Sequence, residues 1–357
     1  MRRVAVLMGG ESQERDVSRV TGVAVAKALA KRGHAVTLLD TNEGVLALPA
    51  GDAPAIGARP PEIEAPAAAL APAGATTITT LTGSLSGADA VFIALHGGWG
   101  EDGTIQAFFE LAGIPYTGSG VLGSSLAMNK DRAKRVFRAS GIKTPDWAFV
   151  NLSEGIFPAE EDLEEIVESL GDDLVVKPNA EGSTVGLSRA RSLEELAAGV
   201  ELAARYGPEI LVEKFVPGRE LTVGVLGEEA LPVVEIVPEG GLYTYEAKYT
   251  KGKSRYVVPA ALPDELTEGI QEAAVAAFEV LGCAGFARVD FRLSPDGEYE
   301  CLEVNTIPGM TPLSLVPMAA KAAGISFEEL VDHIVELAIA RGTQRQSKGA
   351  GSLKVDS

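Results

Sequence analysis

Within residues 286–305, two of the carboxylates, an amide and a guanidinium lie at spacings that suggest chemistry. Apolar and polar residues alternate on either side of a Pro-Asp-Gly sequence, which is typical of two antiparallel strands joined by a turn. If the Asp-Gly pair forms a two-residue turn, Asp290 lies opposite Glu303, and Arg288 lies opposite Asn305. A three-residue loop would change the register and turn Asp290 and Glu303 to opposite faces.

In the first register these side chains would form a site for divalent cations and phosphate. The oxygens of Asp290, Glu303 and Asn305 are hard ligands that suit Mg²⁺ bridging substrate phosphates. Arg288 would stabilise negative charge that develops beside the metal. The alternative is an edge hairpin with an ordinary surface ion pair.

A second feature is the glycine-rich sequence Glu181-Gly182-Ser183-Thr184-Val185-Gly186. Its glycines allow the backbone to approach phosphate oxygens closely, and its two hydroxyl groups add donors. Lys177 ends the preceding strand within reach of the same phosphates. The sequence lacks the Gly-Lys-Ser/Thr ending of a Walker A loop. The alternative to a phosphate-binding loop is a plain Gly-Ser hairpin.

Two loops in the first hundred residues predict a pocket for a small ligand. Glu14 follows a Gly-Gly turn at the end of the first strand, where α/β proteins commonly bind ligands, and it suits a cationic amine. The alternative is a solvated glutamate that favours the helix dipole. His96 stands beside four glycines after a buried strand and suits a pocket wall, although a histidine that caps a strand end fits as well.

The segment 210–220 has the composition of an adenosine site. Two carboxylates, Glu213 and Glu220, flank the apolar pair Phe215 and Val216, which suits a flat ring. Taken alone, this pattern is weak.

Two later loops would supply hydrogen-bond donors and a lid over the site. The polar loop 238–256 carries Lys248 and Tyr249 and has the length of a lid, with surface disorder as the alternative. After the hairpin, Gly309 would let a backbone N–H point at a developing oxyanion, and Ser314 adds a hydroxyl group.

The elements that position these residues begin with an N-terminal α/β pattern. Short apolar strands at 3–8, 35–40 and 89–98 predict a parallel sheet, and a helix is expected to begin at Asp16 as its N-cap. Residues 43–88, rich in Ala, Pro, Gly and Thr, are interpreted as an insertion with partial order at best.

Beyond residue 120 the pattern becomes richer in strands. Strands are expected on both sides of the glycine loop and from Ile210 onward. The remaining periodicity predicts helices at 130–140, 193–206, 264–281 and 327–341, and residues 342–357 are interpreted as a frayed tail.

Composition narrows the class of protein. A formal net charge of −19 over 357 residues argues against nucleic acid as a partner, because the phosphate backbone needs a basic face. It does not exclude ATP, which a few lysines and backbone N–H groups hold locally. No apolar run reaches membrane-spanning length, and the N-terminus is not that of a secretory signal. Cys283 and Cys301 cannot build a disulfide framework, so we expect a cytoplasmic protein.

Six segments together resemble the D-alanine–D-alanine ligases of the ATP-grasp superfamily. They occur in the family's order and cover nearly the whole chain outside 43–88 and the tail, so the set is far more specific than any one member. The matching segments are GGESQERDVS, HGGWGEDG, PYTGSGVLGSSLAMNKDRAK, VVKPNAEGSTVGLS, EAKY and GFARVDFRL…LEVNTIPGMTPLSLVPMAA.

The resemblance implies an α/β and α+β architecture. An N-terminal parallel-sheet α/β domain would occupy 1–119 and precede a two-subdomain ATP-grasp fold, with ATP between the subdomains. The central subdomain would cover 120–210, the C-terminal one 211–342, and a flexible tail 343–357. The family also implies a homodimer and leaves open a monovalent cation.

The resemblance gives each candidate a role. Glu14, linked to Ser183 and Tyr249, would hold the ammonium of the first D-alanine, and His96 would line that pocket. Arg288 and the Gly309 amide would stabilise the tetrahedral intermediate, while Lys248 and Ser314 would meet the second carboxylate. Two Mg²⁺ or Mn²⁺ ions would be bound by Asp290, Glu303 and Asn305. ATP would be bound by Lys130, Lys177, Glu181, Gly182, Ser183, Thr184, Glu213, Lys214, Phe215, Val216, Glu220 and Lys248.

On this analogy the reaction makes D-alanyl-D-alanine for peptidoglycan precursors. The first carboxylate attacks the γ-phosphate of ATP, and the second amine attacks the resulting D-alanyl phosphate, which releases phosphate and leaves ADP. Closure of the 238–256 loop would protect the acyl phosphate from water.

Three rival hypotheses remain at this point. A related ligase would make D-alanyl-D-lactate or D-alanyl-D-serine; lactate-forming relatives tend to carry histidine where this chain has Tyr249, which favours an amine acceptor. A nucleotide sensor would bind ATP without turnover, but it has no need of two metals and an oxyanion donor. A dinucleotide oxidoreductase lacks its G-x-G-x-x-G fingerprint here.

Overall fold

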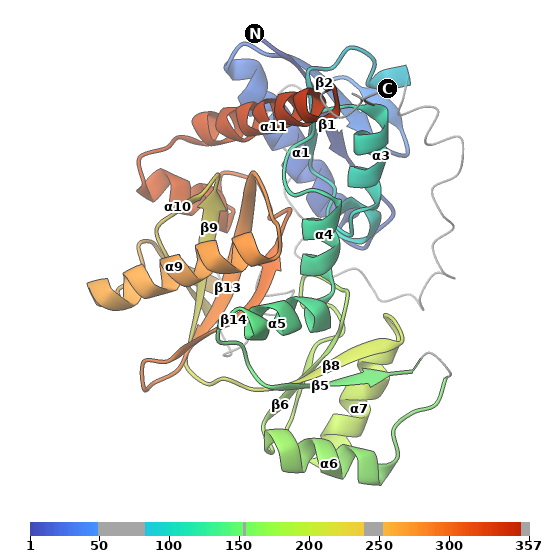
Figure 1. Ribbon diagram of the computed structural model, residues 1–357, viewed down its shortest axis with the longest axis vertical. Coiled ribbons are helices and arrows are strands. Elements are labelled where there is room, and N and C mark those ends of the chain that lie inside the picture. The colour runs from blue at the N-terminus through green and yellow to red at the C-terminus, as the bar shows by residue number, and fades with distance from the viewer. Residues whose placement is uncertain (49–82, 153–154, 239–252, 351–357) are drawn as a thin grey trace, which may run out of the picture.

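Three β-sheets organise the computed structural model, which describes residues 1–48, 83–152, 155–238 and 253–350. Figure 1 shows the N-terminal sheet near the top, the C-terminal sheet at the left and a small central sheet at the bottom, with α4 and α5 running between them. The bounds of these two helices are Val121–Met128 and Lys130–Ala139.

The N-terminal sheet is mainly parallel, as the sequence predicts. Its order is β3-β2-β1-β4, in which β1 pairs in parallel with β2 and β4, and β3 adds an antiparallel edge. Val4 and Val6 pack into one core and Ala5 and Leu7 into another, so β1 is buried on both faces, as is usual in parallel sheets. The strands are β1 (Arg3–Met8), β2 (Ala35–Asp40), β3 (Gly44–Leu46) and β4 (Ala90–Ile93).

Helices cover both faces of this sheet. Residues of α1 and α11 share a core with one face of β1, and residues of α3 share a core with the other face. The helices are α1 (Arg15–Lys31), α3 (Thr104–Ala112) and α11 (Phe327–Ala350), and the 3₁₀ turn η1 is Gly98–Gly100.

The start of α1 corrects the predicted N-cap. The helix begins at Arg15 after Glu14, so Asp16 lies in its first turn and is not the cap. The buried hydroxyl of Ser18 accepts from the Gly9 N–H at 2.9 Å and donates to the Ala94 carbonyl at 2.7 Å. These bonds hold the first turn of α1 directly against the ends of β1 and β4. Glu14 is the N-cap residue that immediately precedes this helix.

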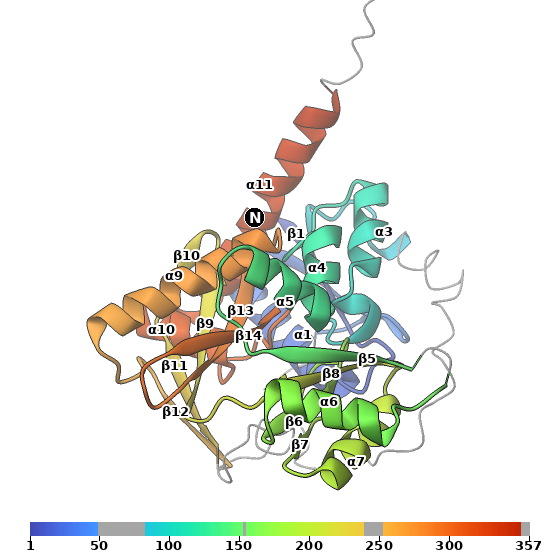
Figure 2. The ribbon, with the colours of Figure 1, turned by 60° about the horizontal axis from the view of Figure 1, so that its bottom comes forward.

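The central sheet is small and antiparallel, with the order β5-β8-β6-β7. Figures 1 and 2 show α6 and α7 together on one face, and their apolar residues share a core with β6 and β8. The elements are β5 (Trp147–Asn151), α6 (Glu160–Leu170), β6 (Leu174–Pro178), β7 (Ser188–Ala190), α7 (Leu193–Ala204) and β8 (Glu209–Lys214).

The C-terminal sheet is antiparallel throughout and has the order β12-β11-β9-β13-β14, with β10 paired to β9. Apolar residues of α9 and α5 share a core with β13 and β14, and α10 packs against the other side of the sheet. The elements are β9 (Arg219–Leu226), β10 (Glu229–Ala230), β11 (Val234–Pro238), β12 (Ser254–Val257), α9 (Asp264–Val280), β13 (Phe286–Leu293), β14 (Tyr299–Asn305) and α10 (Leu315–Ala322).

The C-terminal helix is longer than predicted. It was expected to end at residue 341, with a tail from there, but α11 continues to Ala350. Arg341 donates to the backbone carbonyls of Gly118 and Tyr116, and a Cβ on Gly342 would lie 2.8 Å from Pro115. Gly342 is therefore a close-packing position against the N-terminal domain and does not end the helix.

Part of the predicted insertion lies within the described structure. Residues 44–46 form the edge strand β3, and Leu85 is buried in the core beside α3. The rest of the insertion, residues 49–82, lies outside the described residues.

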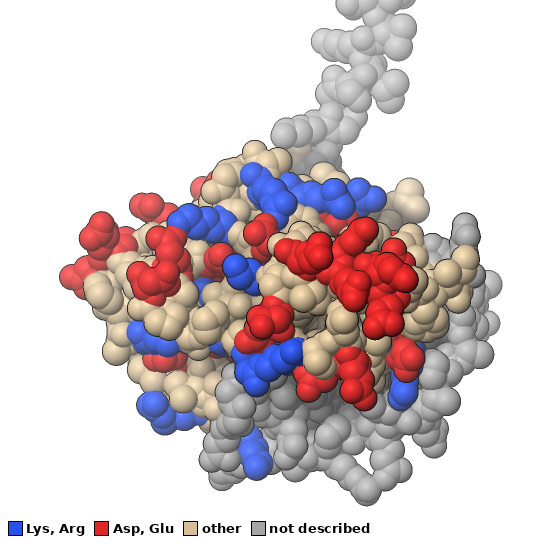
Figure 3. All heavy atoms as spheres, turned by 90° about the horizontal axis from the view of Figure 1, so that it is seen from below, with Lys and Arg blue, Asp and Glu red and all other residues tan. Residues whose placement is uncertain are grey.

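Acidic side chains gather on the face that Figure 3 shows from below. The exposed glutamates of α6, which include Glu160, Glu161 and Glu164, contribute to this charge. No helix in the described part of the chain is long and apolar enough to cross a membrane.

Candidate active site

The hairpin β13–β14 places the two predicted carboxylates opposite each other, but not by the predicted turn. Near the turn Leu293 pairs with Tyr299 and Ser294 N–H donates to Glu298 O, so three residues form the loop. A β-bulge then shifts the register between Asp290 and Phe291, and Asp290 pairs with Glu303. The prediction that these residues face each other is confirmed, and the expected two-residue turn is wrong.

The bulge also explains the shape of the site. With Leu302 as the extra residue, Cys301 and Val304 both reach the core, although they are three positions apart. Leu302 and Glu303 instead both line a cavity on the opposite face. The bulge therefore gives the cavity an apolar contact directly beside a carboxylate.

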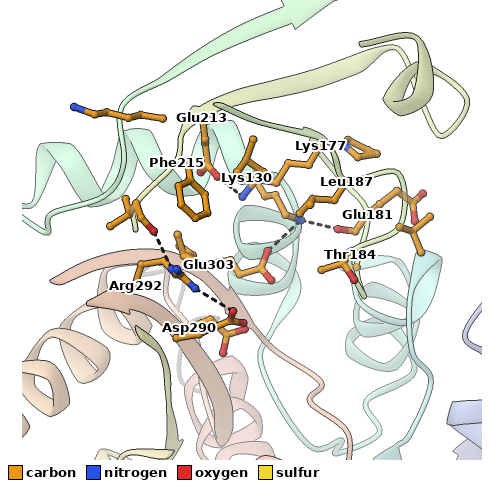
Figure 4. Close-up of a pocket in the computed structure, with 18 residues that line it drawn as sticks. Lys130, Lys177, Glu181, Thr184, Leu187, Glu213, Phe215, Asp290, Arg292 and Glu303 are labelled. Carbon is orange, nitrogen blue, oxygen red and sulfur yellow. Dashed lines mark hydrogen bonds and ion pairs between the residues drawn. The ribbon is translucent and has the colours of Figure 1, made fainter. Parts of the chain in front are cut away.

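This cavity lies between the central and C-terminal sheets, and Figure 4 shows side chains from both sheets pointing into it. Six further lining residues were not predicted, among them Leu187, Arg292 and Leu302. The predicted residues that line it are Lys130, Lys177, Glu181, Gly182, Thr184, Glu213, Lys214, Phe215, Val216, Glu220, Asp290 and Glu303.

A buried carboxylate shared by two lysines forms one wall. Glu213 Oε1 lies 2.6 Å from Lys134 Nζ, and its Oε2 lies 2.5 Å from Lys177 Nζ. Burial opposes the charge of Glu213, but the two lysines outweigh this and hold its pKa below the usual value. Burial would also lower the pKa of Lys177, yet Glu213 and Glu303 raise it, so Lys177 stays charged.

Lys130 joins the glycine loop to the hairpin. Its Nζ donates to the Glu181 carbonyl at 2.6 Å and lies 3.4 Å from Glu303 Oε2, as Figure 4 shows. Asn129 caps the helix, because its side chain accepts from Arg132 N–H, and this fixes Lys130 as the first residue of α5. The Lys130 ammonium group is thereby held between the central sheet and the C-terminal sheet.

Arginines shape the end of the cavity that contains Phe215. The guanidinium of Arg189 lies 3.5 Å from the Phe215 ring centre and covers one face of it. Arg292 donates to Val216 O at 3.0 Å and lies 3.4 Å from Glu220 Oε2. These contacts fix the segment that was predicted to bind adenine and ribose.

The glycine loop has a backbone that few residues adopt. Ser183 and Thr184 are both in the left-handed region, with φ values of 49° and 58°. Such conformations cost free energy and concentrate at ligand-binding sites. Here they turn the Ser183 hydroxyl towards Glu14, whose Oε1 accepts its hydrogen bond.

Glu14 therefore lies at the junction of the N-terminal domain and the glycine loop. A Cβ on Gly97 would lie 3.1 Å from Glu14 Oε2, and one on Gly182 would lie 3.2 Å from the same atom. A side chain at either glycine would crowd this oxygen, so both glycines leave room for the carboxylate. The predicted link between Glu14 and Ser183 is present, whereas Tyr249 and Lys248 lie outside the described residues.

His96 is buried between the N-terminal domain and the loop after β14. Its Nδ1 lies 3.0 Å from Ile307 O, its Nε2 lies 3.0 Å from Thr21 Oγ1, and its Nδ1 lies 3.7 Å from Glu101. Burial would lower the pKa of His96, but Glu101, Glu14 and the Ile307 carbonyl together outweigh this and raise it. His96 thus holds the post-hairpin loop against β4 and the helix α1.

The remaining predicted residues lie along that loop. Asn305 Oδ1 accepts from Ile307 N–H at 3.0 Å, and Ser314 Oγ lies 2.9 Å from Thr311 Oγ1. A Cβ on Gly309 would lie 3.2 Å from Ser314 Oγ, so Gly309 and Ser314 are neighbours.

The donor set suits a hard divalent cation. Asp290 accepts from Arg288 through both oxygens, at 2.9 and 2.8 Å, and from Thr222 Oγ1 at 2.6 Å. The Arg288 guanidinium therefore balances the negative charge of this carboxylate. The described residues contain no group of three or more His, Cys, Asp or Glu that could hold a metal. The predicted set has only two carboxylates with an amide, and such a set leaves positions for water and phosphate oxygens, as Mg²⁺ prefers.

Sequence reasoning missed Lys134, Arg292 and Thr222. Lys134 follows Lys130 by four residues, so both lie on one face of α5, and this spacing was the available signal. Arg292 follows Asp290 by two residues on β13, so strand alternation was the available signal for it. Thr222 lies on β9, and only the pairing of β9 with β13 brings it to Asp290.

A pH-dependent effect on stability follows from Glu181. Burial, more than any charge, raises its pKa above the usual 4.5, with Glu14 and Glu101 adding and Lys130 opposing. Between its unfolded and folded pKa values the folded state binds more protons, so stability falls as pH rises through this window. Glu181→Gln should therefore raise the melting temperature near neutral pH, with a gain that shrinks towards pH 4.5. A gain that grows on acidification would contradict this assignment.

Together, two antiparallel sheets with lysines, a glycine loop and opposed carboxylates between them define an ATP-grasp enzyme. Models of two family regions match the chain: "D-ala D-ala ligase N-terminus" over residues 3–119 and "D-ala D-ala ligase C-terminus" over residues 136–336. The chain belongs to the D-alanine–D-alanine ligase family.

Relatives over the full length agree with this assignment. The D-alanine–D-alanine ligase of Syntrophotalea carbinolica is 44% identical, covering 94% of this chain and 95% of the relative. That of Geobacter sulfurreducens is 42% identical, covering 98% and 97%. The crystal structure of the Bacillus anthracis ligase complexed with ATP superimposes with a TM-score of 0.76 at 30% identity, covering 97% of this chain and 100% of that one.

Proposed function

We propose that this chain joins two D-alanines with ATP to make D-alanyl-D-alanine for peptidoglycan precursors. The observation that carries the proposal is the cavity between the two sheets, where lysines from α5 and β6 face carboxylates from β13 and β14. Family membership supports the choice of D-alanine as substrate.

In the proposed mechanism, this cavity holds ATP. Lys130 and Lys177 would neutralise phosphate oxygens while the carboxylate of the first D-alanine attacks the γ-phosphate in line. The loop with Ser183 and Thr184 would cover the phosphates, and Glu213, Lys214, Phe215, Val216 and Glu220 would surround adenine and ribose. Bound at Asp290, Glu303 and Asn305, two Mg²⁺ or Mn²⁺ ions would offset the charge on the phosphate oxygens.

The D-alanine sites would lie where the N-terminal domain meets the glycine loop. Glu14 would hold the first ammonium group and His96 would line that pocket, supported by the bond between Glu14 and Ser183. Arg288 and the Gly309 N–H would stabilise the oxyanion formed when the second amine attacks the D-alanyl phosphate. Ser314, with Lys248, would bind the second carboxylate.

We also propose domain boundaries, a cellular location and an oligomeric state. The three sheets support a division into three parts, with the first boundary near residues 119–120. The second boundary, expected at 210–211, falls inside β8 of the central sheet, so we place it after Lys214. Free thiols at Cys283 and Cys301 support a reducing, cytoplasmic location. A homodimer follows from the family resemblance alone.

Phosphate release in the presence of Mg²⁺, ATP and D-alanine tests the proposal. We expect release to depend on D-alanine and not on L-alanine, with D-alanyl-D-alanine as the product. Competition between D-alanine, D-lactate and D-serine at saturating ATP separates the related ligases. Dominant depsipeptide formation would reject D-alanine as the second substrate, and ATP binding without turnover would favour a sensor.

Glu14→Gln tests the first D-alanine site. Loss of the negative charge should raise the KM for D-alanine about 10- to 100-fold, the size of one hydrogen bond to a charged group, and change the KM for ATP little. Steady-state kinetics with each substrate varied in turn measure the two constants. A rise confined to ATP would move Glu14 to the nucleotide site.

A further inference from the structure

Lys134 is a buried lysine for which the proposed mechanism has no use. Its side chain is fully buried, yet it carries no contact with the cavity surface. Burial, with repulsion from Lys177, lowers its pKa despite the attraction of Glu213. Such a group is costly to bury unless its partners are well arranged.

Its partners form a continuous chain of contacts across the site. Lys134 Nζ lies 2.6 Å from Glu213 Oε1 and donates to Thr144 Oγ1 at 2.7 Å. The Thr144 hydroxyl in turn donates to the backbone carbonyl of Cys301 at 2.7 Å. At the other end, Glu213 Oε2 contacts Lys177. The chain thus consists of two ion pairs on Glu213 and two hydrogen bonds through Thr144.

The chain connects the two sheets that enclose the cavity. Lys177 and Glu213 belong to the central sheet, whereas Cys301 lies on β14, next to the bulge that orients Glu303. The Cys301 N–H also donates to Lys143 O at 2.8 Å, so the outer edge of β14 is held on both sides of this residue. Lys134 is the charged group at the centre of this connection.

We propose that Lys134 is a positioning residue for the nucleotide site, which holds Glu213 and the edge of β14 so that Lys177 faces the phosphates. With two lysines on one carboxylate, the group keeps one net positive charge for an anionic ligand. Without Lys134, Glu213 and Lys177 form a neutral pair, and the connection from Glu213 through Thr144 to β14 is lost. This role rests on the proposed nucleotide site and extends it to a residue that does not touch ATP.

Lys134→Met is expected to weaken nucleotide binding selectively. The dissociation constant for ADP and the KM for ATP should each rise about tenfold, comparable to the loss of one charge-assisted contact. The KM for D-alanine should stay near the wild-type value. Isothermal titration with ADP and steady-state kinetics measure these constants, and thermal denaturation reports folding separately. An unchanged ADP affinity in a folded variant would overturn the proposal.

Two further variants keep the test decisive if Lys134→Met folds poorly. Thr144→Val keeps side-chain shape but removes the link to Cys301, and it should weaken ADP binding in the same direction by a smaller factor. Lys134→Met combined with Glu213→Gln leaves Lys177 as the one charge of this cluster, so the net charge is restored but the contacts that position Lys177 are not, and ADP affinity should stay low. Wild-type affinity in both variants would leave Lys134 a purely structural residue.

Lys143→Met is the matched control. Lys143 is nine residues away in sequence, is largely exposed and pairs with Glu298 at the hairpin turn, so its loss should leave ADP binding unchanged. Wild-type phosphate release with D-alanine establishes the ligase activity independently. Its absence would reject the proposed function, whereas ADP titration would still decide the role of Lys134.

Discussion

Replacing Glu303 by Gln is expected to lower kcat about 10³-fold while leaving the fold intact. The amide keeps the shape of the side chain but removes the charge that lies opposite Asp290 and 3.4 Å from Lys130. Loss of one metal-binding carboxylate removes several kcal/mol of transition-state stabilisation, and about 4 kcal/mol corresponds to this factor. Phosphate-release assays over a range of Mg²⁺ concentrations measure the effect, and higher Mg²⁺ should recover part of the rate.

Glu298→Gln on the same hairpin serves as the control. Glu298 lies in the exposed turn and pairs with Lys143, so its loss should leave both kcat and the Mg²⁺ dependence unchanged. If Glu303→Gln kept wild-type kcat at low Mg²⁺, the hairpin would not be the metal site. The proposal for Asp290 and Asn305 would then fail with it.

The hairpin shows what the sequence could and could not predict. Alternation of apolar and polar residues identified both strands and the faces of β13, since Ala287, Val289 and Phe291 all reach the core. The pairing of Asp290 with Glu303 was correct only because a three-residue loop and a bulge offset each other. Nothing in the local sequence distinguishes that combination from a two-residue turn, because both keep the outer residues opposed.

The ends of helices show a different limit. Periodicity placed the start of α5 and the end of α9 well, and in the structure Asn129 caps the first of these helices. Local signals failed for α1 and α11, whose ends depend on contacts with β1 and with Pro115. Tertiary contacts decide these ends, and a single sequence does not contain them in readable form.

The sequence predicted individual residues of the site but not the contacts between them. Charged residues near glycines marked Lys177 and Glu14 as candidates, and a carboxylate beside an apolar pair marked Glu213. The cavity brings Lys177 and Glu213 together. The sharing of Glu213 between Lys134 and Lys177 requires α5 to pack beside β6 and β8, which only the fold specifies.

Replacing Lys177 by Met should lower kcat/KM for ATP about 10³-fold with little loss of stability. The variant removes a charge that faces the proposed phosphate site, and such cations contribute several kcal/mol to phosphoryl transfer. The fold should tolerate the change because Glu213 keeps Lys134 as its partner, 2.6 Å away. Kinetics at varied ATP and thermal denaturation measure the two effects. Lys31→Met, on the exposed side of α1, is the matched control.

Stability should fall sharply only when both lysines are replaced. In Lys134→Met with Lys177→Met, Glu213 is left as a buried carboxylate without a cation, which costs about 3–5 kcal/mol. Each single variant retains one lysine, so the double variant should lose far more stability than the sum of the two single losses. Additive losses in urea denaturation would mean that the two lysines act independently. Glu213 would then not be the residue through which they are coupled, and the arrangement of Lys177 at the phosphates would need another cause.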